Sequence, residues 1–316
     1  MSIIKLKRLA YTRNVLKEHM QYMKSGVYVP LRNMRTYTLR ESASNRTVLG
    51  YQFGNDLKMK IIRFLFKVCC KDVGMSSDIQ GTVFYVNNNI PNPKRIKIFD
   101  YDRKIVLVKY RDEEVYKQEL QIYSTVAKYF GNPKVLKNNS EEKIIYEELI
   151  ERDLCVDYDD SIKNMMFVQI VQMYCKFFKE RFSQKGESKS DFPRCLQHND
   201  LSSLNIIFDE QGECHIIDWE HCDENVFFYD IFRWIINDAQ QEKDVYLLKS
   251  YLDGRYDKQL NTLFSLAGCA YDVQKRVEYL DFTYDVMMNM GQKKNDDWSM
   301  WEKMRDDFKS ILSELK

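Results

Sequence analysis

The sequence lacks the features that mark membrane, secreted and nucleic-acid-binding proteins. No apolar run approaches the roughly 20 residues that span a bilayer. The first residues carry Lys5, Lys7 and Arg8 but no apolar core or small-residue cleavage site of a signal peptide. The 48 Lys and Arg residues against 47 Asp and Glu residues leave a net charge of +1, which gives no overall attraction for nucleic acid. We therefore expect a cytoplasmic protein with no transmembrane segment and no nucleic-acid partner.

Cysteine pairs with redox or metal spacing are also absent. None of the eight cysteines forms a Cys-x-x-Cys pair, which favours reduced thiols. Six residues that lie close in sequence raise zinc as an alternative: Cys195, His198, Cys214, His215, His221 and Cys222. Cys214 and His215, however, are neighbours on an expected strand and would point to opposite faces of it. The pattern disfavours a zinc site.

The composition that is present fits a folded chain of one or two domains. At 316 residues, with 44% hydrophobic and 14% aromatic residues, the chain can bury a substantial core. Charge is uneven, because residues 1–50 carry ten Lys or Arg and two Glu, a net of +8. We interpret residues 1–55 as a basic N-terminal arm. It either docks on the acidic remainder of the chain or makes a peripheral contact with anionic lipid or glycan.

The most informative segment combines two short motifs. They are His198-Asn199-Asp200-Leu201-Ser202-Ser203-Leu204-Asn205 and Ile216-Ile217-Asp218-Trp219-Glu220. An Asp, an Asn five residues later and a second Asp after a short hairpin repeat the spacing of the protein-kinase catalytic template. In that template one carboxylate accepts the proton of the attacking hydroxyl. The amide oxygen and the second carboxylate hold magnesium.

A hairpin is expected between the two motifs. Residues 206–208 and 214–217 are rich in β-branched and apolar residues, and Asp209-Glu210-Gln211-Gly212 between them is typical of a turn. Such a hairpin would bring Asn205 and Asp218 together at its open end. An ordinary hairpin with solvated polar ends is the alternative. It does not account for His-x-Asp before the hairpin and Asp-x-Glu after it.

Over residues 190–236 these motifs, with Asn225 and Tyr229-Asp230-Ile231, resemble a known family. It is the choline/ethanolamine kinase branch of the aminoglycoside phosphotransferase superfamily, which has a kinase-like fold. The Asn between His198 and Asp200 is similar to choline kinases, whereas the aminoglycoside enzymes usually have Gly there. The resemblance implies ATP and Mg²⁺ as cofactors and a transferase that phosphorylates a hydroxyl group.

The resemblance also implies roles for single residues. Asp200 corresponds to the catalytic base, and His198 supports its loop by hydrogen bonding. Asn205 and Asp218 correspond to magnesium ligands, and Glu220 to an acidic residue near a second metal.

Asp230 resembles a buried Asp that anchors the catalytic loop through backbone amides. The alternative for Asp230 is a helix N-cap before residues 231–236.

The remaining elements follow from hydrophobic periodicity. We expect helices over residues 4–23, 56–71 and 112–129, an extended segment over 27–30, and strands over 82–86, 95–99, 105–110, 134–136 and 143–146. Beyond residue 156 the chain reads as mostly helical. The prediction is an α+β, two-lobed protein-kinase-like fold. An antiparallel-sheet N-lobe occupies residues 56–149, and a helical catalytic C-lobe occupies residues 150–316.

Within the N-lobe, the resemblance implies four nucleotide-binding features. Lys109 at the end of a strand would neutralise the ATP phosphates, and Glu119 on the next helix would hold Lys109 in place. The backbone of Glu147-Glu148-Leu149 would receive the adenine. Either Gly74-Met75-Ser76-Ser77, with Ser76 and Ser77 as phosphate ligands, or residues 87–93 would cover the phosphates.

The acceptor is the least determined part. A choline-type cation requires aromatic faces, and the candidates are Tyr229, Trp234, Tyr284, Trp298 and Trp301. The paired-Trp helix typical of choline kinases is missing around residues 284–288, so a sugar or cell-surface glycan is the alternative to an amino alcohol. A non-catalytic kinase-like protein that binds nucleotide or a partner is a further hypothesis. A protein kinase is disfavoured because the catalytic loop lacks Lys or Arg and no Ala-Pro-Glu follows.

Overall fold

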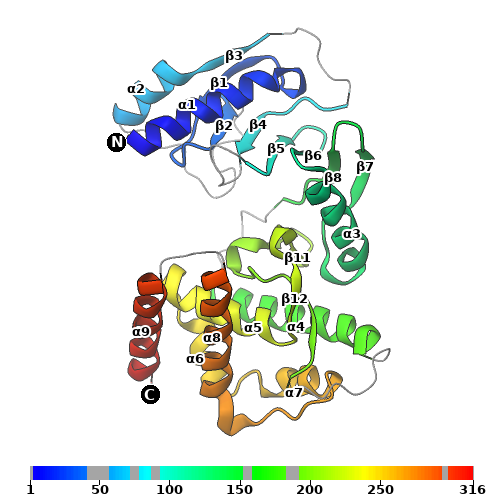
Figure 1. The fold of residues 1–316 in the computed structure, drawn as a ribbon, viewed down its shortest axis with the longest axis vertical. Coiled ribbons are helices and arrows are strands. Elements are labelled where there is room, and N and C mark those ends of the chain that lie inside the picture. Colours follow the sequence, from blue (N-terminus) through cyan, green and yellow to red (C-terminus); the bar gives the residue numbers. More distant parts are fainter. Residues whose placement is uncertain are drawn as a thin grey trace. The chain divides into compact units, whose positions relative to one another are not determined.

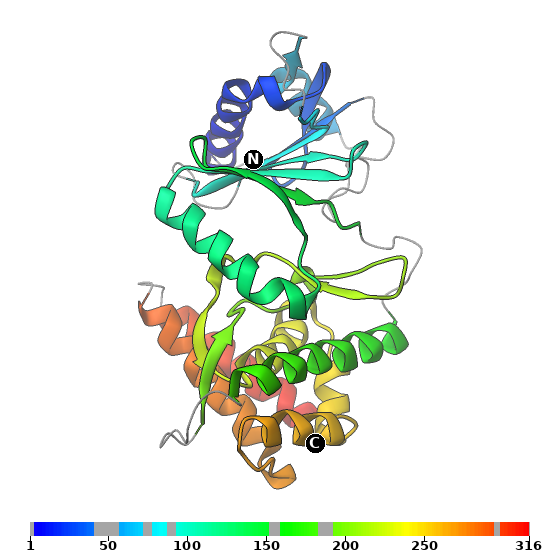
Figure 2. The same ribbon diagram turned by 90° about the vertical axis from the view of Figure 1, so that its right-hand side faces the viewer.

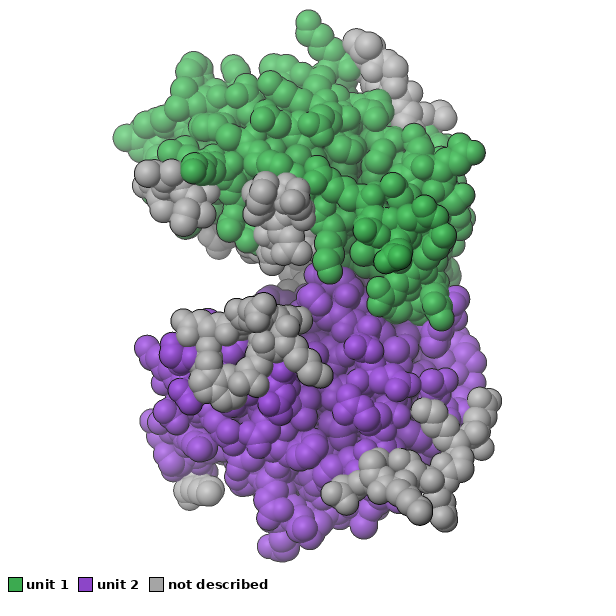
Figure 3. All heavy atoms as spheres, in the orientation of Figure 1, with its two compact units in different colours: residues 1–123, 133–150 green, residues 124–132, 151–316 purple. Residues whose placement is uncertain are grey.

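The computed structural model describes residues 3–40, 57–71, 78–86, 93–151, 159–182, 192–293 and 298–315. The chain forms two compact units, shown in Figures 1 and 3. The first unit comprises residues 1–123 and 133–150, and the second comprises residues 124–132 and 151–316. The division after residue 150 lies beside the lobe boundary that we expect from the sequence.

The first unit is built on an antiparallel sheet. Eight strands of the described residues pair in the order β3-β1-β2-β4-β5-β6-β8-β7. Their bounds are β1 Gly26–Pro30, β2 Thr36–Leu39, β3 Val68–Cys70, β4 Val83–Val86, β5 Arg95–Asp100, β6 Ile105–Tyr110, β7 Val135–Asn139 and β8 Ile144–Glu148. The five strands expected between residues 82 and 146 are all present. Strand β1 matches the extended segment, and β2 and β3 come in addition.

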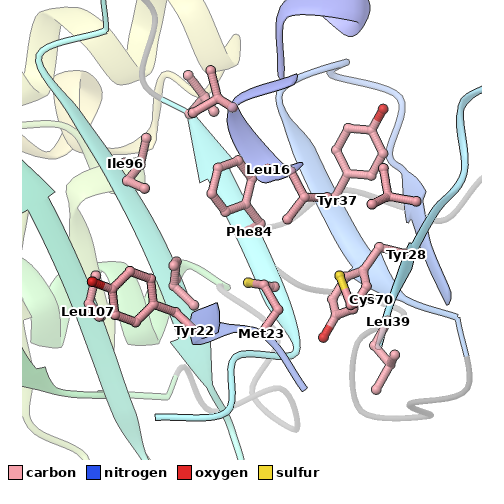
Figure 4. Packing of buried hydrophobic residues seen from close by; sticks show 14 of the residues in the cluster. Leu16, Tyr22, Met23, Tyr28, Tyr37, Leu39, Cys70, Phe84, Ile96 and Leu107 are labelled. Carbon is pink, nitrogen blue, oxygen red and sulfur yellow. The ribbon is translucent and has the colours of Figure 1, made fainter. Parts of the chain in front are cut away.

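Helices cover both faces of this sheet (Figures 1 and 2). They are α1 Ile3–Glu18, the short helix η1 Met20–Tyr22, α2 Leu57–Phe66 and α3 Glu113–Phe130. On one face, Leu16 and Tyr22 pack with Phe84 and Leu107 of the strands, as Figure 4 shows. On the other face, residues of α3 pack with alternate positions of the same strands, because successive strand residues point to opposite sides. The sheet is therefore buried on both sides.

Two expectations about the N-terminal region need correction. The helix expected over residues 56–71 ends at Phe66, and Val68–Cys70 pairs antiparallel with β1. Burial alternates along these three residues, as it does in a strand with one covered face. Residues 3–40 are not a separate arm, because β1 and β2 lie inside the sheet order and Leu9 is fully buried.

The second unit is mostly helical and carries two small antiparallel ribbons. Its helices are α4 Asp160–Phe182, α5 Tyr229–Asn237, α6 Tyr246–Leu252, α7 Asp257–Leu266, α8 Arg276–Lys293 and α9 Trp298–Glu314. Short helical turns are η3 Ser203–Asn205, η4 Trp219–His221, η5 Asp238–Glu242 and η6 Val273–Lys275. The ribbons pair β9 Arg194–Gln197 with β12 Asp223–Val226 and β10 Ile206–Phe208 with β11 Cys214–Ile216. The α+β fold class is confirmed.

Buried aromatic rings form much of the core of this unit. The rings of Phe228 and Phe264 stack with centroids 5.4 Å apart, and Phe167 and Tyr256 stack at 3.9 Å. Because aromatic side chains bury large areas, this packing stabilises α4 against α7 and joins α7 to the residue before α5. The core provides a rigid support for the loops that carry the two motifs.

Candidate active site

The expected hairpin is present and brings the ends of the two motifs together. Ile206 of β10 pairs with Ile216 of β11, and the amide of Ile217 donates to the carbonyl of Asn205 at 3.0 Å. At the turn, the side chain of Asp209 accepts the amides of Gln211 and Glu213, which is a reason for the Asp at this position. Asn205 and Asp218 therefore lie at the open end of one hairpin.

Asp230 holds the catalytic loop in place through hydrogen bonds from the loop's backbone amides. Its carboxylate accepts the backbone amides of His198 and Asn199 at 2.5 and 2.9 Å, and the hydroxyl of Tyr174 at 2.5 Å. Burial raises the pKa of Asp230, and these donors and the nearby His198 act in the opposite direction. Helix α5 starts after Phe228 without a side-chain cap, so the interpretation of Asp230 as an N-cap is wrong.

Asn199 explains why the loop needs a small polar residue between His198 and Asp200. Its φ of +62° lies in the left-handed region, where Asn and Gly are the tolerated residues. The Asn199 side chain donates to the carbonyls of His221 and Asp223 at 3.2 and 3.1 Å. These contacts tie the catalytic loop to the segment after the second motif.

His198 supports the loop from a fully buried position. Its Nδ1 accepts the backbone N–H of Asp200 at 3.2 Å, so Nε2 carries the proton and donates to the carbonyl of Ile217 at 2.8 Å. Both ring nitrogens are thereby used in holding the two motifs together. This geometry agrees with a supporting role and leaves no ring nitrogen for proton transfer to a substrate.

Asn205 and Asp218 offer oxygen atoms of the kind that magnesium prefers. The Asn205 amide nitrogen donates to the carbonyl of Asp200 at 2.7 Å, which fixes the amide and turns its Oδ1 away from that carbonyl. Asp218 has a φ of +68° and directly precedes the turn η4. One amide oxygen and one carboxylate on a shared hairpin end fit a hard divalent cation.

Glu220 lies within η4, and its carboxylate is 3.6 Å from Nε2 of His221. Within the described part of the chain, no three His, Cys, Asp or Glu side chains gather closely enough to bind a metal. The expected role of Glu220 at a second metal therefore stays a prediction, and a zinc cluster is not formed by these residues.

Asp200 has a partner that the sequence motifs did not indicate. Nη2 of Arg233, on α5, lies 2.6 Å from Oδ1 of Asp200, and Nη1 of Arg233 is 3.1 Å from the hydroxyl of Tyr229. The Arg233 side chain is 15% exposed and that of Asp200 42%. One carboxylate oxygen of Asp200 is thus fixed by a largely buried cation, and the carboxylate still faces solvent. Arg233 lies three residues after Asp230 in the sequence, and only this helical spacing hints at its role.

The expected pair of Lys109 and Glu119 is not made. Lys109 lies two residues after Leu107 on the same strand, so both side chains point to the same face of the sheet, the face that α1 and η1 cover. There the Lys109 ammonium lies 5.6 Å from the centre of the Tyr22 ring. Glu119 lies on the opposite face and binds Arg95 at 2.6 Å and the hydroxyl of Tyr110 at 2.9 Å. The sheet separates the two side chains, and Arg95 takes the place that we expected Lys109 to fill.

The side chain of Glu147 also belongs to the interior of the first unit. Its side chain is buried beneath α3 and accepts the hydroxyl of Tyr123 at 3.0 Å. Burial raises the pKa of Glu147 to about 7, and Lys97 is the charge that opposes this shift most. Lys97 shares its strand face with Arg95 and is paired in register with Val108. Lys97 and Arg95 are the cations that the sequence interpretation missed on the α3 face.

The expected adenine-binding segment uses its amides within the first unit. The N–H of Glu148 donates to the backbone carbonyl of Lys134, and the N–H of Leu149 donates to the backbone carbonyl of Lys104, each at 2.9 Å. These two amides therefore already have backbone partners, and the role of this segment toward adenine stays a prediction. Ser76 and Ser77 lie outside the described residues, as do residues 87–92 of the alternative phosphate loop.

A cavity of about 370 Å³ adjoins the catalytic loop on the second unit. Six of the eight residues that line it have polar side chains; the eight are Arg194, Asn199, Asp223, Glu224, Asn225, Val286, Asn289 and Met290. Among the described residues, no aromatic side chain lines this cavity. Tyr229, Trp234 and Tyr284, which we expected to provide aromatic faces, are fully buried in the core, and Trp301 lies on α9. The side chain of Trp298 lies outside the described part.

Comparison with known proteins agrees with the motifs. Residues 172–261 match the model of the phosphotransferase enzyme family, so the expected resemblance of this part of the chain to the aminoglycoside phosphotransferase superfamily is confirmed. No curated protein matched the chain.

Similar solved structures include the choline kinase LicA from Streptococcus pneumoniae, at 13% identity over 72% of this chain and 93% of that one, with a TM-score of 0.42. A Plasmodium vivax ethanolamine kinase is 14% identical over 70% and 80% of the two chains, with a TM-score of 0.38. The aminoglycoside phosphotransferase APH(4)-Ia is 11% identical over 71% and 92%, with a TM-score of 0.42.

Proposed function

We propose that this protein is an ATP-dependent phosphotransferase that phosphorylates a hydroxyl group of a small molecule, with Asp200 as the catalytic base. The observation that carries the proposal is the geometry of the catalytic loop and hairpin. Asp230 and His198 fix the loop, and Asn205 and Asp218 meet at the hairpin end. The match of residues 172–261 to a phosphotransferase family supports it.

In this proposal, Asp200 accepts the proton of the acceptor hydroxyl as that oxygen attacks the γ-phosphorus of ATP, and the bond from that phosphorus to the β–γ bridging oxygen breaks, so that ADP leaves. Arg233 holds Oδ1 of Asp200 and orients the carboxylate, so the second oxygen is presented to the acceptor. Asn205 and Asp218 would hold Mg²⁺, which when bound supplies charge neutralisation of the phosphates. His198 and Asp230 keep the loop rigid and take no proton from the substrate.

The cavity beside the catalytic loop supports an acceptor with N–H or O–H donors. The carboxylates of Asp223 and Glu224 and the side-chain amides of Asn225 and Asn289 can accept hydrogen bonds from a primary ammonium. A quaternary ammonium has no N–H and depends on aromatic faces. We therefore propose an amino alcohol of the ethanolamine type as the acceptor. A sugar hydroxyl is the second candidate, because the same amides and carboxylates bind hydroxyl groups.

A screen of ADP release distinguishes these acceptors. The purified chain with Mg·ATP is offered ethanolamine, choline, common sugars and aminoglycosides. We expect turnover with ethanolamine to exceed that with choline. Activity on sugars alone would overturn the proposal that the acceptor is an amino alcohol, and the proposal that the protein is a phosphotransferase would stand. No turnover on any alcohol, with ATP still bound, would favour a non-catalytic nucleotide-binding protein.

Substitutions in the cavity test the acceptor site directly. Asp223→Asn with Glu224→Gln should raise KM for a cationic acceptor by roughly two- to fivefold, because each lost carboxylate is partly exposed and screened by water. Asp253→Asn, an exposed carboxylate at the end of α6, is the matched control and should leave KM unchanged.

A further inference from the structure

Helix α2 presents large apolar side chains to solvent along one side. Leu57, Ile61, Phe64 and Leu65 are 74%, 52%, 71% and 59% exposed. At about 100° per residue these four positions form one continuous stripe along the helix. Scattered apolar residues on a surface are ordinary, whereas a contiguous stripe of this kind marks an interaction site.

The opposite side of α2 already anchors the helix to its own unit. Met59 and Ile62 are buried in the cluster that α1 and the sheet share, and Phe66 packs against it. Arg63 on the same side is also buried. The exposed stripe is therefore a second apolar face, which the described residues of this unit leave uncovered.

Basic residues border the stripe on both sides. Lys58 and Lys60 are exposed and fall on opposite edges of it, and the helix contains no acidic residue. The ammonium of Lys67 lies 5.3 Å from the ring of Phe64. Lysines at both edges of an apolar stripe are the arrangement of helices that lie in a membrane surface, where the long stems keep the charges in water.

Helix α1 extends the basic surface. Figure 1 shows α1 beside α2. A cavity of about 480 Å³ between them is lined by Arg13 and Lys17 of α1. Phe64, Leu65 and Lys67 also line it. A concave site rimmed by three cations beside apolar side chains suits an anionic headgroup next to its acyl chains.

We propose that α2, together with the adjoining side of α1, docks this protein on an anionic membrane surface. The stripe of Leu57, Ile61, Phe64 and Leu65 enters the boundary between headgroups and acyl chains, and the flanking lysines contact anionic headgroups. The attachment is peripheral, since no helix in the described ranges is long and apolar enough to cross a membrane. Pairing of two copies through this face is disfavoured, because it would place Lys58 and Lys60 of both copies close together.

Vesicle co-sedimentation of the full chain tests the proposal. We expect binding to vesicles of phosphatidylcholine with phosphatidylglycerol, much weaker binding to phosphatidylcholine alone, and release at high salt, because surface charges are then screened. Phe64→Ser with Leu65→Ser should weaken binding at least about tenfold, and Lys58→Glu with Lys60→Glu by a similar factor. All four side chains are exposed, so circular dichroism should show unchanged folding.

Matched controls carry the same changes elsewhere on the surface. Leu136→Ser with Met300→Ser replaces two apolar side chains that are 52% and 47% exposed, and Lys258→Glu with Lys309→Glu reverses two exposed charges. Both should bind vesicles like the wild type. Asp200→Asn should also bind normally, so this test stands apart from the proposed phosphotransfer.

Three results would overturn the proposal. One is a wild-type chain that does not bind anionic vesicles. Another is binding that the α2 variants and the controls reduce equally. The third is a wild-type dimer in analytical ultracentrifugation that Phe64→Ser with Leu65→Ser dissociates, which would assign the stripe to a second copy of the chain.

Discussion

Single hydrogen bonds decide the shape of the catalytic loop. A buried carboxylate, Asp230, receives two consecutive loop amides, and His198 bridges the two motifs through both ring nitrogens. These contacts connect residues that the sequence singled out, so their identity could be predicted. The partner of Asp200 could not, because Arg233 reaches it across 33 residues through the packing of α5.

Replacing Asp230 should show how much the anchor contributes. Asp230→Ala leaves the amides of His198 and Asn199 and the hydroxyl of Tyr174 without their acceptor. Unfolding in urea should therefore require about 3–5 kcal/mol less free energy than for the wild type. Tyr174→Phe removes one of the three donors and should cost about 1–2 kcal/mol. Equal stability of Asp230→Ala and wild type would contradict the anchoring role.

Arg233 should matter for turnover more than for nucleotide binding. Arg233→Gln removes the charge that fixes Oδ1 of Asp200, and we expect kcat to fall roughly tenfold or more with little change in the Kd of Mg·ATP. The control is Arg255→Gln, whose guanidinium similarly binds a tyrosine hydroxyl, that of Tyr246 at 2.8 Å. An unaltered kcat in Arg233→Gln would show that the contact with Asp200 has no catalytic consequence.

At the scale of elements, the alternation of side chains between the two faces of a strand explains why the expected pair of Lys109 and Glu119 was wrong. The run Ile105-Val106-Leu107-Val108-Lys109-Tyr110 is apolar on both faces because the sheet is covered on both sides. Alternation therefore cannot reveal which face Lys109 occupies. The strand itself was predictable from β-branched residues, whereas its two environments depend on α1 and α3, which pack from distant parts of the chain.

The two strand lysines should differ in their effect on nucleotide binding. A lysine that acts with Glu119 must lie on the α3 face, which Lys97 shares and Lys109 does not. Lys97→Ala should raise the Kd of Mg·ATP about tenfold by calorimetry, and Lys109→Ala should change it little. The reverse order would restore Lys109 as the phosphate-neutralising residue.

Buried Glu147 should make the stability of the protein depend on pH. Its pKa rises from 4.5 to about 7 on folding, so the folded state binds more protons than the unfolded state between these values. The stabilisation from the protonated form is complete below about pH 4.5 and is lost as pH rises to about 7, an effect on the order of 3 kcal/mol.

Glu147→Gln isolates this effect because the amide is neutral at every pH and its oxygen can still accept from Tyr123. Relative to wild type, the variant should gain stability between pH 4.5 and 7 and show a constant difference above that range. Urea unfolding at several pH values measures it, and parallel curves for the two proteins would contradict the raised pKa.

At the scale of the whole molecule, the two units differ in how much the sequence revealed. The catalytic hairpin and its loop are local in sequence, with motifs of fixed spacing, so their geometry and the α+β class were predictable. The first unit contains β2 and β3, which lack strong periodicity; β3 pairs with β1 and β2 pairs with β4 across long sequence separations. Tertiary pairing selected those strands, and short segments carry little signal for it.

The same limit applied to the acceptor. From the sequence, an aromatic residue of the helical unit can either line an acceptor pocket or pack in the hydrophobic core. In the structure, Tyr229, Trp234 and Tyr284 are fully buried in the core. Asn199 and Asn225 belong to the motifs that the sequence singled out, but polar residues carry no periodic signal that predicts a shared cavity beside the catalytic loop. Which polar residues gather there depends on the pairing of β9 with β12.

Calorimetry of Mg·ATP binding tests the metal ligands. Asp218→Ala and Asn205→Ala each remove one oxygen ligand and should weaken magnesium-dependent ATP binding, with a smaller effect when magnesium is omitted. Asp209→Ala, in the turn of the same hairpin, controls for changes in the hairpin itself. Unchanged affinity in both ligand variants would rule out a magnesium site at the hairpin end.

The most direct measurement compares the turnover of the wild type and Asp200→Asn on the acceptor that the ADP-release screen identifies. The carboxamide keeps the shape of the side chain and cannot act as a base, so kcat should fall by roughly 10²–10⁴ with the Kd of Mg·ATP near that of the wild type. Turnover of Asp200→Asn at the wild-type rate would contradict the assignment of Asp200 as the catalytic base.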